Sequence, residues 1–406
     1  MEITELLMHA NKNNASDLHL SPNSPPLMRI NGDIMSLKTD ILNADDIKSV
    51  LYSIMTENQR AEFEKELEID FAIQFGEDLR FRVNAFNTLK GPAAAFRSIP
   101  TKILTLEQLG TPDIIKKLST LHKGLVLVTG PTGSGKSTTL AAMIDYINKN
   151  MSKHILTIED PVEFVHKSMK SLVNHRELGK NTVSFARALK SALREDPDVI
   201  LVGELRDLET IELALSAAET GHLVMGTLHT NSAAKTMDRI IDAFPAGDKS
   251  LIMSMLSTSI EGIIAQTLIK TKDGKGRVAA LEILLGTPAI RNLIREGKMP
   301  QIYSLMQVGS KVGMRTMKDS VFGLYEKGLI DMPAAKAALN IKDDEVVESD
   351  ASKLSSYGAQ GDQKSGSAGG SGGGGIGGGA NQRNTPNSMG SGGMEKSRPS
   401  SDDGGF

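Results

Sequence analysis

The feature that most constrains this chain is a glycine-rich loop, with the sequence Gly130-Pro131-Thr132-Gly133-Ser134-Gly135-Lys136-Ser137. It matches the G-x-x-x-x-G-K-[ST] pattern of phosphate-binding loops. An apolar run typical of a buried strand precedes it at 125–129, and a helical pattern begins near Lys136. In this context the backbone N–H groups turn toward phosphate oxygens at a helix N-terminus. A glycine-rich turn that binds nothing is the alternative.

The residue types of this loop suit a nucleotide bound with a metal ion. Lys136 is expected to reach the β- and γ-phosphates, and the Ser137 hydroxyl to ligate Mg²⁺. Thr138 continues the loop into the helix. We therefore predict ATP and Mg²⁺ as ligands, with residues 130–138 forming the nucleotide-binding segment.

A second strand candidate, residues 199–202, is followed by Gly203 and Glu204. Short apolar runs separated by helical stretches predict a parallel sheet covered on both faces, so this strand should end beside the phosphate loop. A carboxylate there can act as the base that orients and deprotonates water. An acid that only initiates the next helix is the alternative.

A third group of acids, Glu159, Asp160 and Glu163, follows the strand candidate 154–158. Three acids in five residues suit the water shell of a metal ion. A solvated turn before Pro161 is the alternative.

Two histidines flank the strand candidate 223–228. His229 follows the strand and is a candidate sensor of the γ-phosphate, whereas His222 precedes it and should lie at the opposite end. A purely structural histidine is the alternative at both positions.

The first hundred residues predict a smaller α+β unit. Alternating apolar residues predict strands near 69–75 and 79–85, and Asn31-Gly32 predicts a hairpin turn. Helices are predicted near 45–55 and 57–66, the second capped by Thr56 with Gln59. The predicted division is an N-terminal domain at 1–100, a linker at 101–106, an ATPase core at 107–285, a helical region at 286–345 and a flexible Gly/Ser-rich tail at 346–406.

Composition excludes several classes of function. The formal net charge of −3 over 406 residues gives no electrostatic footprint for nucleic acid, and the absence of cysteine removes thiolate metal sites and cysteine nucleophiles. The start of the chain has no leader-like pattern, and no apolar run approaches the ~20 residues that span a bilayer. We expect a soluble cytoplasmic chain.

Together these motifs resemble the secretion ATPases of type II and type IV pilus systems, and within them the PilT-type pilus retraction ATPases. The resemblance covers about residues 1–340 and rests on the phosphate loop, the acidic box at 158–164, the segment at 193–207 and the histidine box at 220–232. It implies a homohexameric ring of chains, each with a PAS-like domain and a RecA-like domain. It also implies a cytoplasmic motor at the inner membrane, at the base of the pilus, with an inner-membrane platform protein as mechanical partner.

The same resemblance implies roles for individual residues. Glu204 would be the catalytic base, Glu163 would support the magnesium–water shell, and His229 would sense the γ-phosphate. Arg82 and Arg97 are candidates for closing over the nucleotide, and Arg194 and Arg206 for coupling between elements. Outward-facing strand positions remain the alternative for Arg82 and Arg97.

The segment 289–296 resembles the helix that marks retraction ATPases, although its spacing alone indicates only an amphipathic helix. The absence of the four-cysteine module usual in extension-type relatives agrees with retraction. Three alternatives remain: a PilU-type accessory retraction ATPase, which could also be a paralogous partner; a nucleotide-regulated interaction module; and an extension or secretion motor.

Overall fold

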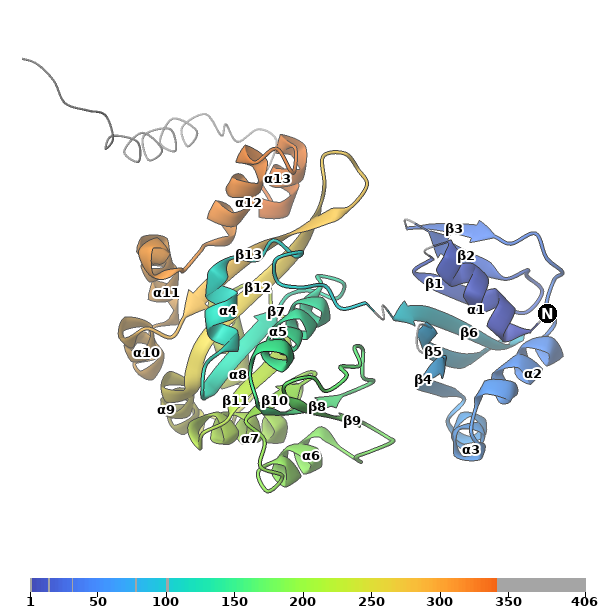
Figure 1. The fold of residues 1–406 in the computed structure, drawn as a ribbon, viewed down its shortest axis with the longest axis horizontal. Coiled ribbons are helices and arrows are strands. Elements are labelled where there is room, and N and C mark those ends of the chain that lie inside the picture. The colour runs from blue at the N-terminus through green and yellow to red at the C-terminus, as the bar shows by residue number, and fades with distance from the viewer. Residues whose placement is uncertain (1, 14, 31, 77–78, 100–101, 342–406) are drawn as a thin grey trace, which may run out of the picture. The chain divides into compact units, whose positions relative to one another are not determined.

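The computed structural model describes residues 2–13, 15–30, 32–76, 79–99 and 102–341, which Figure 1 shows as a ribbon. Parts of the predictions fall elsewhere. Asn31 of the predicted hairpin turn, residues 77–78 between two predicted strands, Thr101 of the predicted linker, residues 342–345 of the predicted helical region and the whole tail at 346–406 lie outside the described residues.

An antiparallel sheet is built from the N-terminal strands in the order β3-β2-β1-β6-β5-β4. Its strands are β1 (Asp17–Leu20), β2 (Leu27–Ile30), β3 (Asp33–Ser36), β4 (Glu68–Phe75), β5 (Leu79–Thr88) and β6 (Gly91–Ile99). Strands β2 and β3 pair antiparallel, with Ile30 opposite Asp33.

The N-terminal helices are α1 (Ile3–Lys12), α2 (Ala44–Ile54) and α3 (Glu57–Glu66). They pack their apolar residues with those of the sheet into one hydrophobic cluster, which includes Leu7, Leu51, Phe81 and Phe96. The predicted cap of α3 is confirmed, because the Thr56 hydroxyl accepts from the N–H of Gln59 while the Gln59 side chain accepts from the N–H of Thr56.

A second sheet runs in the order β13-β12-β7-β11-β10-β8-β9, and every neighbouring pair is parallel except β12 and β13. Its strands are β7 (Gly124–Thr129), β8 (His154–Glu159), β9 (Leu172–Glu177), β10 (Val199–Val202), β11 (Leu223–Leu228), β12 (Ile260–Lys270) and β13 (Arg277–Leu285). The predicted strands β7, β8, β10 and β11 lie side by side in its centre. The α/β class is confirmed.

The sequence patterns did not predict strands β9 and β12, and the physical reason is different for each. Strand β9 is an edge strand whose pattern is mostly polar, with Leu172 exposed. Strand β12 begins at Ile260 directly after helix α9 ends at Ser259, so no turn residue marks the change.

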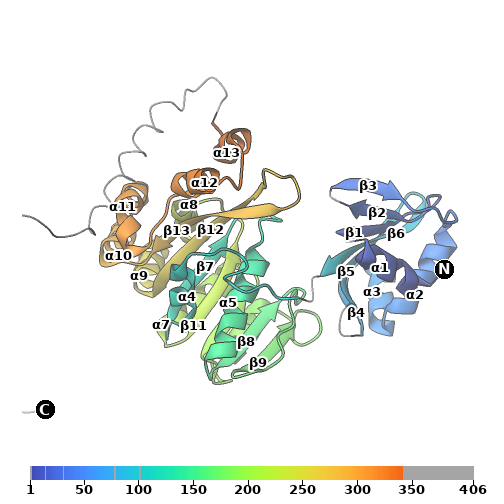
Figure 2. The same ribbon diagram turned by 45° about the horizontal axis from the view of Figure 1, so that its top comes forward.

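Helices cover both faces of this sheet (Figures 1 and 2). Leu125 and Leu127 of β7 pack into a cluster with α6 to α9, whereas Val126 and Val128 pack into another with α4 and α5. Successive residues of a strand point to opposite faces, which is why one apolar run serves both clusters. The helices are α4 (Asp113–Ser119), α5 (Lys136–Asn150), α6 (Phe185–Ala192), α7 (Leu208–Glu219), α8 (Ala233–Asp242) and α9 (Lys249–Ser259).

The C-terminal part of the described chain is helical, as predicted. It comprises α10 (Pro288–Arg295), η1 (Met299–Gln301), α11 (Ile302–Val308), η2 (Gly309–Val312), α12 (Met317–Glu326) and α13 (Met332–Leu339). Helices α12 and α13 lie beside the β12–β13 hairpin, where Val321 and Ala335 share a cluster with Ile269 (Figure 2). Within residues that the structure describes, no helix is both long and apolar enough to cross a membrane.

Candidate functional site

The phosphate loop connects the carboxyl end of β7 to the N-terminus of α5. Gly130, Gly133 and Gly135 have φ values of +146°, +78° and +86°, which side chains disfavour. A Cβ at Gly130 would also lie 2.3 Å from the carbonyl oxygen of Gln266. The first turn of α5 has no side-chain cap, so its N–H groups remain for an anion. This geometry fits a phosphate group.

The ammonium of Lys136 is buried against the loop. Its Nζ donates to the carbonyl of Gly130 at 2.9 Å and to that of Pro131 at 3.2 Å. Burial lowers the pKa of this ammonium, while the charges of Glu204 and Glu163 act in the opposite sense. Neutral carbonyls thus hold a cation that the charged oxygens of a phosphate could attract.

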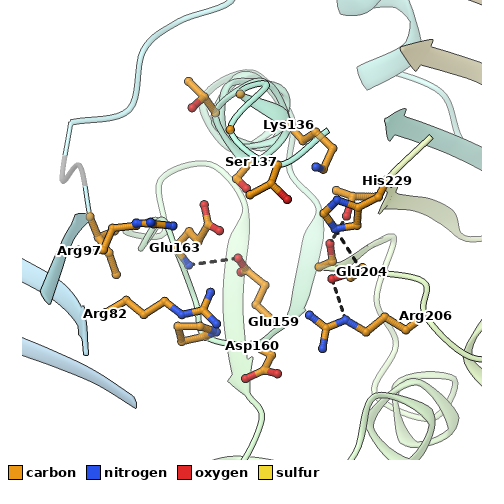
Figure 3. A pocket seen from close by; sticks show the side chains of 18 of the residues that line it. Arg82, Arg97, Lys136, Ser137, Glu159, Asp160, Glu163, Glu204, Arg206 and His229 are labelled. Atoms are coloured by element: carbon orange, nitrogen blue, oxygen red, sulfur yellow. Dashed lines mark hydrogen bonds and ion pairs between the residues drawn. The ribbon is translucent and has the colours of Figure 1, made fainter. Parts of the chain in front are cut away.

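Glu204 lies two residues beyond β10, across the pocket from the phosphate loop (Figure 3). Its Oε2 pairs with Arg206 Nε at 2.7 Å and its Oε1 lies 3.3 Å from His229 Nε2. Strand β11 holds this turn, because the Thr227 hydroxyl donates to the carbonyl of Gly203. The structure therefore brings Glu204 and His229 together, and places His222 at the other end of β11, where its ring contacts the carbonyl of Ala217.

The acidic box begins where β8 ends. Glu159 Oε2 accepts from the backbone N–H of Glu163 at 3.3 Å, while its Oε1 has no hydrogen-bond partner within the described residues. Burial raises the pKa of the Glu159 carboxyl to about 7. Glu163 is half-buried and lines the pocket with Asp160 (Figure 3). The alternative of a solvated turn does not describe Glu159, whose side chain lies largely inside the protein.

Two arginines from the N-terminal sheet also line the pocket. Arg82 makes bidentate contacts with Asp70, including Nε to Oδ1 at 3.0 Å, and these contacts raise its pKa. Arg97 donates from Nε to Asp17 Oδ1 at 2.9 Å. Each cation is therefore already paired with a carboxylate of its own sheet.

These groups surround a cavity of about 790 Å³, large enough for a nucleotide. Its lining holds every loop residue predicted to bind phosphate except Gly130, Pro131 and Ser134, together with Glu204, His229, Glu163, Arg82, Arg97 and Arg206. Arg206 contacts Glu204 directly, which was not predicted, and Arg194 is exposed outside this lining. Sequence reasoning also missed Phe185, Leu268 and Arg277 of the lining, since no short motif contains them.

The donor set fits a magnesium ion bound together with phosphates. The Ser137 hydroxyl and the carboxylates of Glu163, Glu159 and Glu204 supply only hard oxygen donors to one cavity. Among the described residues no cluster of three acids or histidines could hold a metal by itself. That agrees with the usual habit of Mg²⁺, which takes one or two protein oxygens and completes its shell with phosphates and water.

Comparison with known proteins assigns the chain to a family. The family described as type II/IV secretion system protein matches residues 1–282. The chain belongs to this family. It is 57% identical over 341 residues to the type IV pilus retraction ATPase PilT of Pseudomonas aeruginosa, an alignment that spans 84% of this chain and 99% of that protein.

Two further relatives refine the comparison. The type IV pilus ATPase PilU of Pseudomonas aeruginosa is 41% identical over 362 residues, covering 88% of this chain and 95% of the relative. A crystal structure of the pilus retraction motor PilT with bound ADP superposes with a TM-score of 0.77 at 50% identity, covering 83% of this chain and 97% of that one. The chain is an ATPase of this family and uses an adenine nucleotide.

Proposed function

We infer that this chain hydrolyses ATP to drive retraction of type IV pili, and thereby twitching motility. The identity of 57% to a PilT protein over nearly its full length supports this function, against 41% to PilU. The single structural observation that carries it is the cavity in which Lys136, Ser137 and Glu204 meet. An accessory PilU-type role remains the second candidate, because both relatives match over most of the chain.

We propose that the loop N–H groups and Lys136 hold the β- and γ-phosphates, and that Ser137 and Glu163 hold Mg²⁺. Magnesium, when bound with the nucleotide, neutralises charge on the transferred phosphoryl group. Glu204 accepts a proton from the water whose oxygen attacks the γ-phosphorus, while the bond from that phosphorus to the β–γ bridging oxygen breaks.

Three further residues of the pocket would assist this step. His229, in contact with Glu204, would link the base to the γ-phosphate. Arg82 and Arg97 would exchange Asp70 and Asp17 for phosphate oxygens when the nucleotide is bound. A pure nucleotide sensor could dispense with this set of acids, which disfavours the interaction-module alternative.

We propose further that the chain works as a homohexameric ring, with an inner-membrane platform protein as its mechanical partner, at the cytoplasmic face of the membrane. A paralogous retraction ATPase could share the work. Membership of the family supports these assignments.

Helix α10, whose segment resembles the marker of retraction ATPases, divides into two sets of residues. Ile290 and Ile294 are fully buried. Arg291 donates to the carbonyl of Gly286 at 2.6 Å and to Glu261 Oε1 at 2.6 Å, so it holds the helix in place. Ala289, Asn292 and Arg295 of the helix and the C-cap residue Glu296 are exposed and available to a partner.

Replacement of Arg291 by Ala should lower the free energy of unfolding by about 1–3 kcal/mol, because a partly buried carboxylate and a partly buried carbonyl lose their donor. Arg295→Ala, the same change on the exposed face, should alter it by less than about 0.5 kcal/mol. Urea denaturation of both variants measures the difference. Equal stability of the two variants would contradict the positioning role of Arg291.

The function is tested by counting surface pili in the source organism with Lys136→Ala introduced at the native locus. Loss of the phosphate contact should stop the motor, so we expect more pili and no twitching motility. Fewer pili would indicate an extension motor instead. An unchanged count with normal motility would contradict the retraction function.

A further inference from the structure

Gln266 is a buried amide that connects strand β12 to the phosphate loop. The residue is 3% exposed and lies in the middle of β12, next to β7 in the sheet. Its Nε2 donates to the carbonyl of Ser134 at 2.6 Å, and its Oε1 accepts from the Thr139 hydroxyl at 2.7 Å. A carbonyl oxygen can only accept, so this contact fixes which end of the amide faces the loop.

The two partners belong to the phosphate loop and to the helix that follows it. Ser134 is in the loop itself, and Thr139 is in the first turns of α5. The C=O and N–H bonds of one trans peptide unit point in opposite directions. The N–H groups of the loop can therefore face a phosphate only if the carbonyls of the loop point away from it. The amide N–H of Gln266 donates to the Ser134 carbonyl, which points away from the phosphate site.

Close packing adds to these hydrogen bonds. A Cβ at Gly135 would lie 2.8 Å from Nε2 of Gln266, and a Cβ at Gly130 would lie 2.3 Å from its carbonyl oxygen. The side chain of Gln266 therefore lies close to Gly135, and its backbone lies close to Gly130. The absence of side chains at these two glycines is what allows β12 to approach the loop.

We propose that Gln266 is a positioning residue, which holds the phosphate loop and the start of α5 in the arrangement that receives the phosphates of the nucleotide. It acts through Ser134 and Thr139 and is not among the described residues that line the cavity. The proposal rests on the proposed nucleotide site, and it does not depend on pilus retraction.

The test compares three variants of the full chain. Gln266→Met keeps the length and approximate volume of the side chain but removes both hydrogen bonds. Thr139→Val removes only the contact with α5 and leaves the one with Ser134. Gln307→Met makes the same chemical change as the first variant on an exposed residue of α11 and is the matched control.

Each variant is assayed for ADP affinity by calorimetry, for KM and kcat with ATP, and for folding by circular dichroism. For Gln266→Met we expect the Kd for ADP and the KM for ATP to rise roughly tenfold or more, because the Ser134 carbonyl loses its buried donor. The kcat should change less, since the loop contacts the phosphates already in the ground state. Thr139→Val should raise Kd less than about threefold, and the control should match the wild type.

Folded Gln266→Met with wild-type Kd and KM would overturn the proposal, and so would an equal loss in the Gln307→Met control, which would show that the effect does not depend on the position of the amide. If Gln266→Met does not fold, Gln266→Asn replaces it, because its amide is one methylene too short to span both partners. A folded Asn variant with unchanged ADP affinity would also overturn the proposal. Failure of the wild-type chain to bind ADP would instead contradict the proposed function.

Discussion

Glu204→Gln is expected to lower the ATPase turnover number by a factor of about 10²–10⁴, the range that a positioned general base contributes. The amide keeps the size of the side chain and its reach toward Arg206 and His229, so the pocket should retain its shape. It cannot take a proton from water, so hydrolysis should slow by this factor with ATP still bound. Phosphate release and ATP binding, measured on the same purified protein, separate the two steps.

Glu209→Gln is the matched control for this prediction. Glu209 is exposed on the first turn of α7 and does not line the cavity. The same chemical change there should leave turnover within about twofold of wild type, since substitutions of exposed residues remote from a site have small effects. Unimpaired hydrolysis in Glu204→Gln would refute its role as the base.

Gly130→Ala should abolish nucleotide binding and destabilise the protein by about 3 kcal/mol or more. The new methyl group would lie 2.3 Å from the carbonyl oxygen of Gln266 and 2.5 Å from Oγ of Ser134, on a residue whose φ is +146°. Strain at positive φ and overpacking each cost one to several kcal/mol, and here they act together. Thermal unfolding with and without ADP measures both effects.

Two further alanine variants separate the effect of backbone strain from the effect of overpacking. Gly133→Ala has a φ of +78° but nothing within 4 Å of its Cβ, so it should show the strain without the clash. Gly247→Ala has neither problem and should unfold like the wild type. Equal effects at Gly130 and Gly133 would mean that the contact with Gln266 contributes nothing.

The sequence by itself predicted the elements that carry the strongest local signals. The phosphate loop is contiguous, and its glycines, its lysine and its place between strand and helix are all visible over eight residues. Short runs of apolar residues were enough to predict the central strands. A strand that is buried on both faces is apolar at every position and does not alternate with polar residues. The α/β class and the nearness of Glu204 to the loop followed from the rule that parallel strands end at one edge.

Tertiary structure decided what no local pattern contains. Gln266 meets Ser134 across 132 positions of sequence, and its role depends on which strand lies beside β7. The partners of Arg82, Arg97 and Arg291 depend on register and packing, since one guanidinium can reach many acceptors. Local signals specify strands, helices and turns, whereas the cavity and its supporting contacts arise only when distant segments pack together.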